Sequence, residues 1–346
     1  MNNLVKLLWN GEQKRLRAVW RIGLYSLLIF LFAAFLFTVI ILITGAGFAF
    51  SSPRNDTDFP TALVYERVLG LINNELILLL ISSTTTVAST LLVTRFSIKV
   101  IDRRIRMPVK KQVDRSWWKD LGMGCLVGSI SIGLIFAILT AFGNLQVTGF
   151  NADFGDLEFT SNFLVALLTF ICVGVYEEVV FRGYMLKNLS ESFSGKWLTN
   201  ESAVILAVIA SSMAFSILHL TNPNANFLSF INILVIGFLL CLSVLLTRRL
   251  AFAIGFHFLW NFSQGVLFGI PVSGLAPQAP LLDVKISGAT WLTGGSFGFE
   301  GSVLCVITNL LLSILILFLL RSRNKGLRLN FEIAEYTPGN LPDSDS

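Results

Sequence analysis

Two adjacent glutamates, Glu177 and Glu178, interrupt an apolar stretch that is long enough to cross a membrane. A carboxylate at the bilayer centre costs about 2.5–3.5 kcal/mol on insertion scales, so two in succession are hard to explain as filler. Arg182 follows four residues after Glu178, and side chains at this spacing face each other on a helix. We therefore expect Glu178 to pair with Arg182, while Glu177, turned about 100° away, stays free for chemistry.

The chain has only two histidines, and both lie in apolar stretches. His219 ends the sequence FSILH, whereas His257 begins HFLWN, which places His257 and Asn261 on one helical face. Two imidazoles and a carboxylate suit a catalytic zinc site with an open position for water. The same groups can also act without a metal, with a glutamate as base and His and Asn as polarising groups. The structural alternative is a set of polar contacts that hold helices together in lipid.

Composition defines the elements that must position these residues. The 346 residues are 54% hydrophobic and 14% charged, with a mean hydropathy of +0.73, whereas soluble domains are about 25% charged. The apolar runs are long and continuous, which is typical of spanning helices. We predict an all-α polytopic membrane protein with an intramembrane polar cavity and about eight spans, at 22–48, 69–94, 121–143, 162–188, 202–220, 227–247, 250–270 and 302–320.

Basic residues predict the orientation of these spans. Of 26 Lys and Arg residues, 23 fall in alternate segments that include both ends of the chain. This asymmetry places both termini in the cytoplasm. The net charge of +5 is thus a topology signal, and we expect no nucleic-acid partner. The four cysteines lie in apolar spans without CxxC spacing, which favours buried free thiols. We also expect no cleavable signal peptide.

The predicted spans raise a question of depth. Residue counting puts Glu177 and His257 toward the cytoplasmic half, but His219 near the outer end of its span. Either that helix is tilted or displaced, or the TNPNAN turn that follows it lies inside the protein. Irregular backbone at membrane depth is tolerated only where it is buried or lines a water-filled cavity. A hydrolase needs such a cavity, because water must reach the scissile bond.

Three short sequences carry a resemblance to a known family. EEVVFR resembles the EExxxR motif, FSILH the FxxxH motif and HFLWN the HxxxN motif of the CPBP family of intramembrane proteases, which includes CAAX prenyl endopeptidases and bacteriocin-processing and immunity proteins. The resemblance covers about 115–320, and TGGSFGFEGS before the last span looks like a further, less specific feature. It implies a protease core at 115–320, preceded by a basic arm, two spans and a cytoplasmic loop (1–114). A cytoplasmic polar tail with a disordered end follows (321–346).

The resemblance also implies roles. Glu177 and His219 would activate the attacking water, and His257 and Asn261 would bind metal or stabilise the oxyanion, with Glu178 and Arg182 completing the site. We expect a zinc ion on Glu177, His219 and His257. The expected activity is hydrolysis of a membrane-associated protein or peptide in a bacterial cytoplasmic membrane, in contact with lipid. Two alternatives stay open: an ion-coupled transporter with these groups as a relay, and a non-catalytic scaffold such as a bacteriocin-immunity protein.

Overall fold

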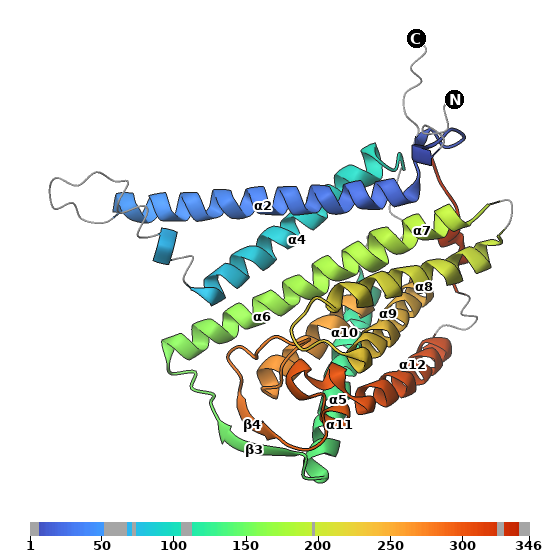
Figure 1. Ribbon diagram of the computed structural model, residues 1–346. Coiled ribbons are helices and arrows are strands. Elements are labelled where there is room, and N and C mark those ends of the chain that lie inside the picture. Colours follow the sequence, from blue (N-terminus) through green and yellow to red (C-terminus); the bar gives the residue numbers. More distant parts are fainter. Residues whose placement is uncertain are drawn as a thin grey trace.

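A computed structural model describes residues 7–51, 68–70, 74–104, 113–195, 198–323 and 329–338, and most of them are helical. Figure 1 shows the helices, which in chain order are α2 (Ala18–Ser51), α4 (Glu75–Val100), α5 (Arg115–Ala141), α6 (Leu157–Glu178), α7 (Leu186–Phe193), α8 (Asn200–His219), α9 (Phe227–Thr247), α10 (Ala251–Phe262), α11 (Thr290–Thr293) and α12 (Val303–Arg323). Two π-helical segments, η1 (Val179–Met185) and η2 (Ser263–Leu267), directly continue α6 and α10. Short 3₁₀ turns form η3 (Gly295–Phe297), η4 (Phe299–Gly301) and η5 (Phe331–Ala334).

Strands are few in the described part of the chain. Strands β1 (Trp9–Asn10) and β2 (Arg15–Leu16) form an antiparallel pair ahead of α2. Strands β3 (Leu145–Phe150) and β4 (Leu282–Ile286) form a second antiparallel pair, in which Leu145 lies opposite Ile286. This second ribbon joins the loop before α6 to the loop before α11, at the lower end of the molecule in Figure 1.

The helices confirm the prediction of an all-α polytopic membrane protein. Within the described part of the chain, six helices are long and apolar enough to cross a membrane: Ala18–Thr44, Ile77–Val100, Arg115–Ala141, Leu157–Phe193, Asn200–His219 and Phe227–Thr247. The predicted spans at 250–270 and 302–320 are also helical, but shorter. Helix α10 and η2 together cover 251–267, and the apolar part of α12 is Val303–Ile316. Residues 105–112 of the predicted cytoplasmic loop and 339–346 of the predicted disordered tail lie outside the described residues.

Five of the helix starts carry a capping side chain that the sequence shows. Side chains of Asn74, Asp114, Asp156 and Thr199 accept hydrogen bonds from backbone amides in the first turns of α4, α5, α6 and α8. Helix α9 begins with a reciprocal capping box between Asn226 and Ser229. These side chains satisfy amides that have no partner within the helix, and each such cap stabilises its helix by about 1 kcal/mol.

Helix α5 crosses α10 at very close range. A Cβ at Gly124 would lie 2.1 Å from Phe252 O, and one at Gly255 would lie 2.2 Å from Leu121 O. Gly128 approaches the backbone of α10 one turn further along. Small residues at this spacing allow the backbones of membrane helices to touch. The glycines thereby fix the position of α10, the helix that carries His257 and Asn261.

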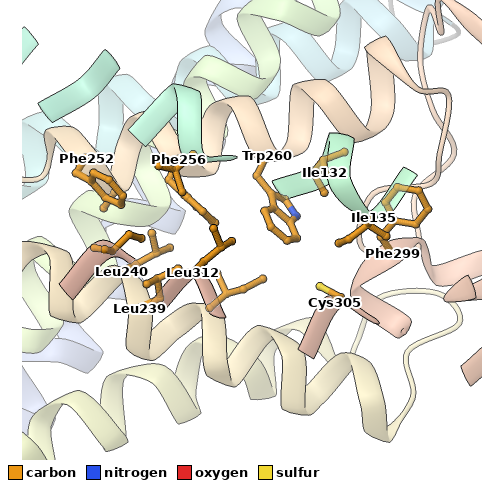
Figure 2. Packing of buried hydrophobic residues seen from close by; sticks show 14 of the residues in the cluster. Ile132, Ile135, Leu239, Leu240, Phe252, Phe256, Trp260, Phe299, Cys305 and Leu312 are labelled. Carbon is orange, nitrogen blue, oxygen red and sulfur yellow. The ribbon is translucent and has the colours of Figure 1, made fainter. Parts of the chain in front are cut away.

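The main hydrophobic core lies between α5, α9, α10 and α12. Figure 2 shows that Phe252, Phe256 and Trp260 line one face of α10 and point toward Leu239 and Leu240 of α9. The Phe256 and Trp260 rings stack with centroids 5.3 Å apart. Because this apolar face is buried against other helices, the opposite face of α10 is directed toward α6, with which it also packs.

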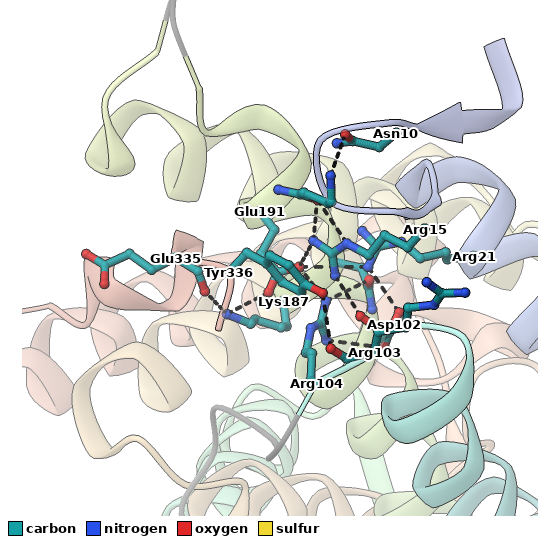
Figure 3. A network of polar contacts seen from close by, with 12 residues as sticks. Asn10, Arg15, Arg21, Asp102, Arg103, Arg104, Lys187, Glu191, Glu335 and Tyr336 are labelled. Carbon is teal, nitrogen blue, oxygen red and sulfur yellow. Dashed lines mark hydrogen bonds and ion pairs between the residues drawn. The ribbon is translucent and has the colours of Figure 1, made fainter. Parts of the chain in front are cut away.

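A buried ionic cluster joins the two ends of the chain to α7 (Figure 3). Its charged members, each 5% exposed or less, are Arg15, Arg21, Asp102, Arg104, Lys187 and Glu191. Glu191 Oε2 lies 2.9 Å from Arg15 Nη2 and 2.5 Å from Arg104 Nη2, and Glu191 Oε1 lies 2.9 Å from Lys187 Nζ. Lys187 Nζ also donates to the backbone oxygens of Ile333 and Glu335.

This cluster brings the described segments near both termini to the same side of the molecule. The Arg15 guanidinium lies 3.5 Å from the centroid of the Tyr336 ring. The cytoplasmic location of both termini stays a prediction. The cluster also ties 7–104 to the rest of the chain, in addition to the packing of α4 against α6. The division into 1–114, 115–320 and 321–346 stays a prediction.

Candidate active site

Glu178 and Arg182 form a buried ion pair at the junction of α6 and η1. Arg182 Nη1 donates to Glu178 Oε1 at 2.8 Å, and both side chains are 0% exposed. The Arg182 guanidinium also lies 4.2 Å from the centroid of the Phe215 ring, within range of a cation–π interaction. The pair expected from the four-residue spacing is therefore present.

The same glutamate orients His257. His257 Nδ1 on α10 lies 2.8 Å from Glu178 Oε1, the oxygen that also accepts from Arg182. A carboxylate paired with a guanidinium is an acceptor only, so Nδ1 carries the proton in this contact. The other ring nitrogen, Nε2, is consequently the atom of His257 that can act on a ligand.

Glu177 lies on the other side of the His257 ring. Glu177 Oε2 is 3.6 Å from His257 Nε2, which is too long for a direct hydrogen bond. Within the described residues that carboxylate oxygen has no hydrogen-bond partner. The two acids thus differ in environment: Glu178 is fully buried and its Oε1 accepts from two protein side chains, whereas Glu177 lies in the wall of a cavity.

His219 lies opposite Glu177 because α8 runs back along α7 and η1. Ser211 Oγ of α8 donates to Phe181 O at 3.0 Å, and the Phe215 and Phe181 rings lie 5.0 Å apart. One turn beyond Phe215 is His219, and one turn before Phe181 is Glu177. This register brings His219 and Glu177 to the same level.

The helix lengths explain why residue counting misplaces His219. The helix predicted at 162–188 continues to Phe193, so α8 begins further along its neighbour and ends opposite the middle of it. The TNPNAN turn then packs against other loops, and Asn222 Nδ2 donates to Ser273 O at 3.0 Å. The turn also supplies Asn222 to the wall of a cavity, as irregular backbone inside a membrane protein requires.

Hydrogen bonding also defines the protonation of His219. Its Nδ1 lies 2.8 Å from Phe215 O, and a carbonyl oxygen can only accept. Nδ1 therefore carries a proton and Nε2 of the neutral ring is an acceptor. Both histidines in the described chain thus have Nδ1 fixed by a protein acceptor, an arrangement that sets the ring orientation in catalytic and metal sites.

Two cavities meet at Glu177 and His219, which line both of them. The larger measures about 740 Å³ and extends along α4 and α6 to the loop 272–278, with His257 and Asn261 also in its wall. The smaller measures about 270 Å³ and lies toward α2, η1 and the middle of α4. A third space of about 30 Å³ is lined by His219, His257 and Asn261, which is room for about two water molecules.

Sequence reasoning did not assign a role to Glu300, which lines the smallest cavity together with Ser273. Gln264 Nε2 of η2 donates to Glu300 Oε2 at 2.5 Å and to Pro271 O at 2.6 Å. Burial raises the pKa of Glu300. The only hint in the sequence is an acid within the glycine-rich stretch TGGSFGFEGS. These contacts connect that stretch to the end of the helix that carries His257.

Both π-helical segments begin next to the polar residues of the site. Segment η1 starts at Val179, directly after Glu178, and η2 starts at Ser263, two residues after Asn261. Single π turns inside α-helices are frequent at functional sites. Here they occur on the two helices that carry the paired acids and the His and Asn residues.

Comparison with known proteins finds one similarity, to a family model. Residues 159–263 match the family model described as type II CAAX prenyl endopeptidase Rce1-like. Over this segment, which is less than half of the chain, the sequence is similar to the CAAX proteases. No curated protein and no solved structure matches the chain. The matched segment contains all six expected site residues, whereas α2 and α4 lie outside it.

Proposed function

We propose that the protein is an intramembrane endopeptidase that hydrolyses a peptide bond in a membrane-associated protein or peptide. The observation that carries the proposal is the junction of the cavities, where Glu177 and His219 share the wall and Glu177 Oε2, without a hydrogen-bond partner among the described residues, lies 3.6 Å from His257 Nε2. Peptide hydrolysis requires a base in the wall of a peptide-sized space, and the two histidines beside Glu177 also line a water-sized space. The family match supports the same reaction class.

In the proposed reaction, Glu177 takes a proton from a water molecule held by Nε2 of His219. The water oxygen adds to the carbonyl carbon of the scissile bond, and the negative charge moves to the carbonyl oxygen. The Asn261 carboxamide, with His257 when its ring is doubly protonated, donates hydrogen bonds to that oxygen. Glu177 then returns the proton to the leaving nitrogen as the C–N bond breaks, which yields a carboxylic acid and an amine.

In this scheme Glu178 and Arg182 act through His257. The 2.8 Å contact from His257 Nδ1 to Glu178 fixes the ring, and Arg182 holds the Glu178 carboxylate by a 2.8 Å ion pair in a fully buried position. Both are thus positioning residues, and Glu177 is the catalytic acid–base group. This division of roles extends the expectation that the two acids are not equivalent.

A zinc ion on Glu177, His219 and His257 is the second part of the proposal. The donors suit zinc in kind, since each imidazole has Nδ1 bound to an oxygen acceptor and Nε2 available. Among the described residues, however, no three His, Cys, Asp or Glu side chains are grouped closely enough to hold an ion. When bound, such an ion would supply Lewis acidity toward water and the carbonyl oxygen.

The test uses the full chain in liposomes and two quenched fluorescent peptides of the same sequence. Both end in Cys-aliphatic-aliphatic-any residue, and one carries an S-farnesyl group. Wild-type protein should cleave at least one of them, and mass spectrometry should locate the new termini. Glu177→Gln should lower the rate by about 10²–10⁴-fold, whereas Glu158→Gln, an exposed acid on the same helix, should not change it.

Two other results would overturn the proposal. If wild-type and Glu177→Gln protein behave alike, Glu177 is not the base. If neither peptide, nor any protein of the native membrane, is cleaved while the liposomes show ion-coupled flux, the transporter alternative takes its place.

A further inference from the structure

Helix α4 presents a row of hydroxyl groups to both cavities that meet at Glu177. Ser82, Ser83 and Thr86 line the larger cavity, and Thr86 and Thr90 line the smaller one. Residues three, four and seven or eight apart share one side of a helix, so these positions form a continuous row. Thr169 of α6 adds a hydroxyl from the opposite wall of the larger cavity.

Two of these hydroxyls have no hydrogen-bond partner among the described residues. They are Thr90 Oγ1 and Thr169 Oγ1, on side chains that are 0% and 4% exposed. In contrast, Thr86 Oγ1 donates to Ser82 O at 2.8 Å, as threonines in membrane helices commonly do. A buried hydroxyl without a partner is unfavourable. Both residues line a cavity, so rotation of either side chain about χ1 would bring its unpartnered hydroxyl to a ligand there.

An extended peptide has the geometry to use this row. Successive hydroxyls on α4 are four residues apart, a rise of about 6 Å. Alternate residues of an extended chain are about 6.6 Å apart, and their amides and carbonyls point the same way. A peptide in a water-poor cavity must satisfy these groups with protein partners. Its main chain can thus follow α4 with one hydroxyl for every second residue.

The charged residues in the cavity walls indicate which charge a bound peptide segment can carry. Among the described residues that line them, the acidic side chains are Glu75 and Glu177, and none is Lys or Arg. An acidic segment would be repelled here, whereas an uncharged or basic one would not.

We propose that the hydroxyl face of α4 (Ser82, Ser83, Thr86 and Thr90), with Thr169 opposite, binds the main chain of an extended, uncharged or basic segment of the substrate. This binding aligns the scissile bond with Glu177 and His219, and the inference rests on the proposed peptidase function. Thr86 and Thr90 lie outside the segment that matches the family, so this face is a feature of this chain's own N-terminal helices.

The first experiment measures KM and kcat of Thr86→Val and Thr90→Val protein on the peptide that wild-type protein cleaves. Each change removes a hydroxyl and keeps the side-chain shape. KM should rise about two- to tenfold, as expected for one lost hydrogen bond, while kcat changes little. Thr84→Val is the matched control, because Thr84 is exposed and its hydroxyl donates to Leu80 O within α4.

A second measurement separates main-chain binding from a structural effect. Peptides with a single N-methylated backbone amide should show one or two positions where methylation raises KM in wild-type protein. At the position that contacts Thr90, methylation should have no further effect in Thr90→Val protein. Independent effects of Thr90→Val and methylation at every position would overturn the inference.

Binding to Glu177→Gln protein distinguishes this inference from the proposed function. Fluorescence anisotropy of the labelled peptide measures affinity without turnover. If Thr90→Val and Thr86→Val weaken binding but wild-type protein cleaves no peptide, the hydroxyl face of α4 binds peptide and the proposed peptidase function is wrong. If wild-type protein cleaves the peptide and neither Thr86→Val nor Thr90→Val changes KM, the peptidase function stands and the proposed role of the hydroxyl face is wrong. Absence of both binding and cleavage would reject both.

Discussion

Replacement of Glu178 by alanine tests how the site is held together. Glu178 Oε1 accepts hydrogen bonds from Arg182 and His257, each at 2.8 Å, in a position with no exposure. Without that carboxylate, Arg182 is a buried cation whose Nε and Nη2 atoms already have no partner among the described residues. Loss of one member of a buried ion pair typically costs about 3–5 kcal/mol. We expect the free energy of unfolding to fall by that amount.

The assay is unfolding by SDS in mixed micelles, followed by tryptophan fluorescence. The matched control is Glu332→Ala, which breaks the exposed ion pair between Arg248 and Glu332, whose side chains are 43% and 68% exposed. Exposed pairs contribute about 0–1 kcal/mol, so this variant should unfold almost as wild type does. If Glu178→Ala protein is as stable as Glu332→Ala protein, Arg182 is not left as an unpaired buried cation, and the reasoning is wrong.

A double variant separates stability from activity. Glu178→Met with Arg182→Met leaves no unpaired charge and should recover part of the lost stability. It still removes the acceptor for His257 Nδ1, so turnover should stay low. Full recovery of turnover together with stability would show that the 2.8 Å contact does not position His257.

Three further predictions concern packing, metal and topology. Gly124→Ala should destabilise the fold by about 1–3 kcal/mol, because its Cβ would lie 2.1 Å from Phe252 O; Gly122→Ala, with nothing within 4 Å, should unfold as wild type does in the same SDS assay. If zinc is part of the mechanism, purified protein should contain near-stoichiometric zinc by mass spectrometry, and a chelator should abolish cleavage in a way that zinc restores; full activity of metal-free protein would leave Glu177 and its histidine partners to act alone. In a cysteine-free background, a cysteine placed between α4 and α5 (101–114) should react only with reagents on the cytoplasmic side, and one between β3 and α6 (151–156) only from outside; the opposite pattern would reverse the predicted orientation.

Short-range features of the site follow from the sequence. The Glu178–Arg182 pair is a consequence of four-residue spacing on one helix, and the shared face of His257 and Asn261 has the same origin. The membrane class follows from composition alone. These features depend on neighbours along the chain, whose relative positions a helix fixes.

The relation between helices could not be predicted in the same way. The depth of His219 depends on where α7 ends, and the polar residues Lys187, Asn188 and Glu191 read as the end of a span although the helix continues through them to Phe193. Burial in the ionic cluster with Arg15 and Arg104 allows that continuation. The contact between Glu178 and His257 likewise depends on the close crossing of α5 and α10, for which isolated glycines are the sole sequence signal.

The π segment η1 sets the angle around the helix axis between Glu177 and Glu178 before it and Lys187 and Glu191 after it. Each residue of an α-helix advances the chain by about 100° around the axis, and a π turn accommodates an extra residue without breaking the helix. Deletion of one residue within Val179–Met185 would therefore rotate Lys187 and Glu191 by about a quarter turn relative to Glu177 and Glu178. The ionic cluster and the acid pair could then not both form, so the length of this seven-residue segment is as constrained as the identity of the glutamates before it.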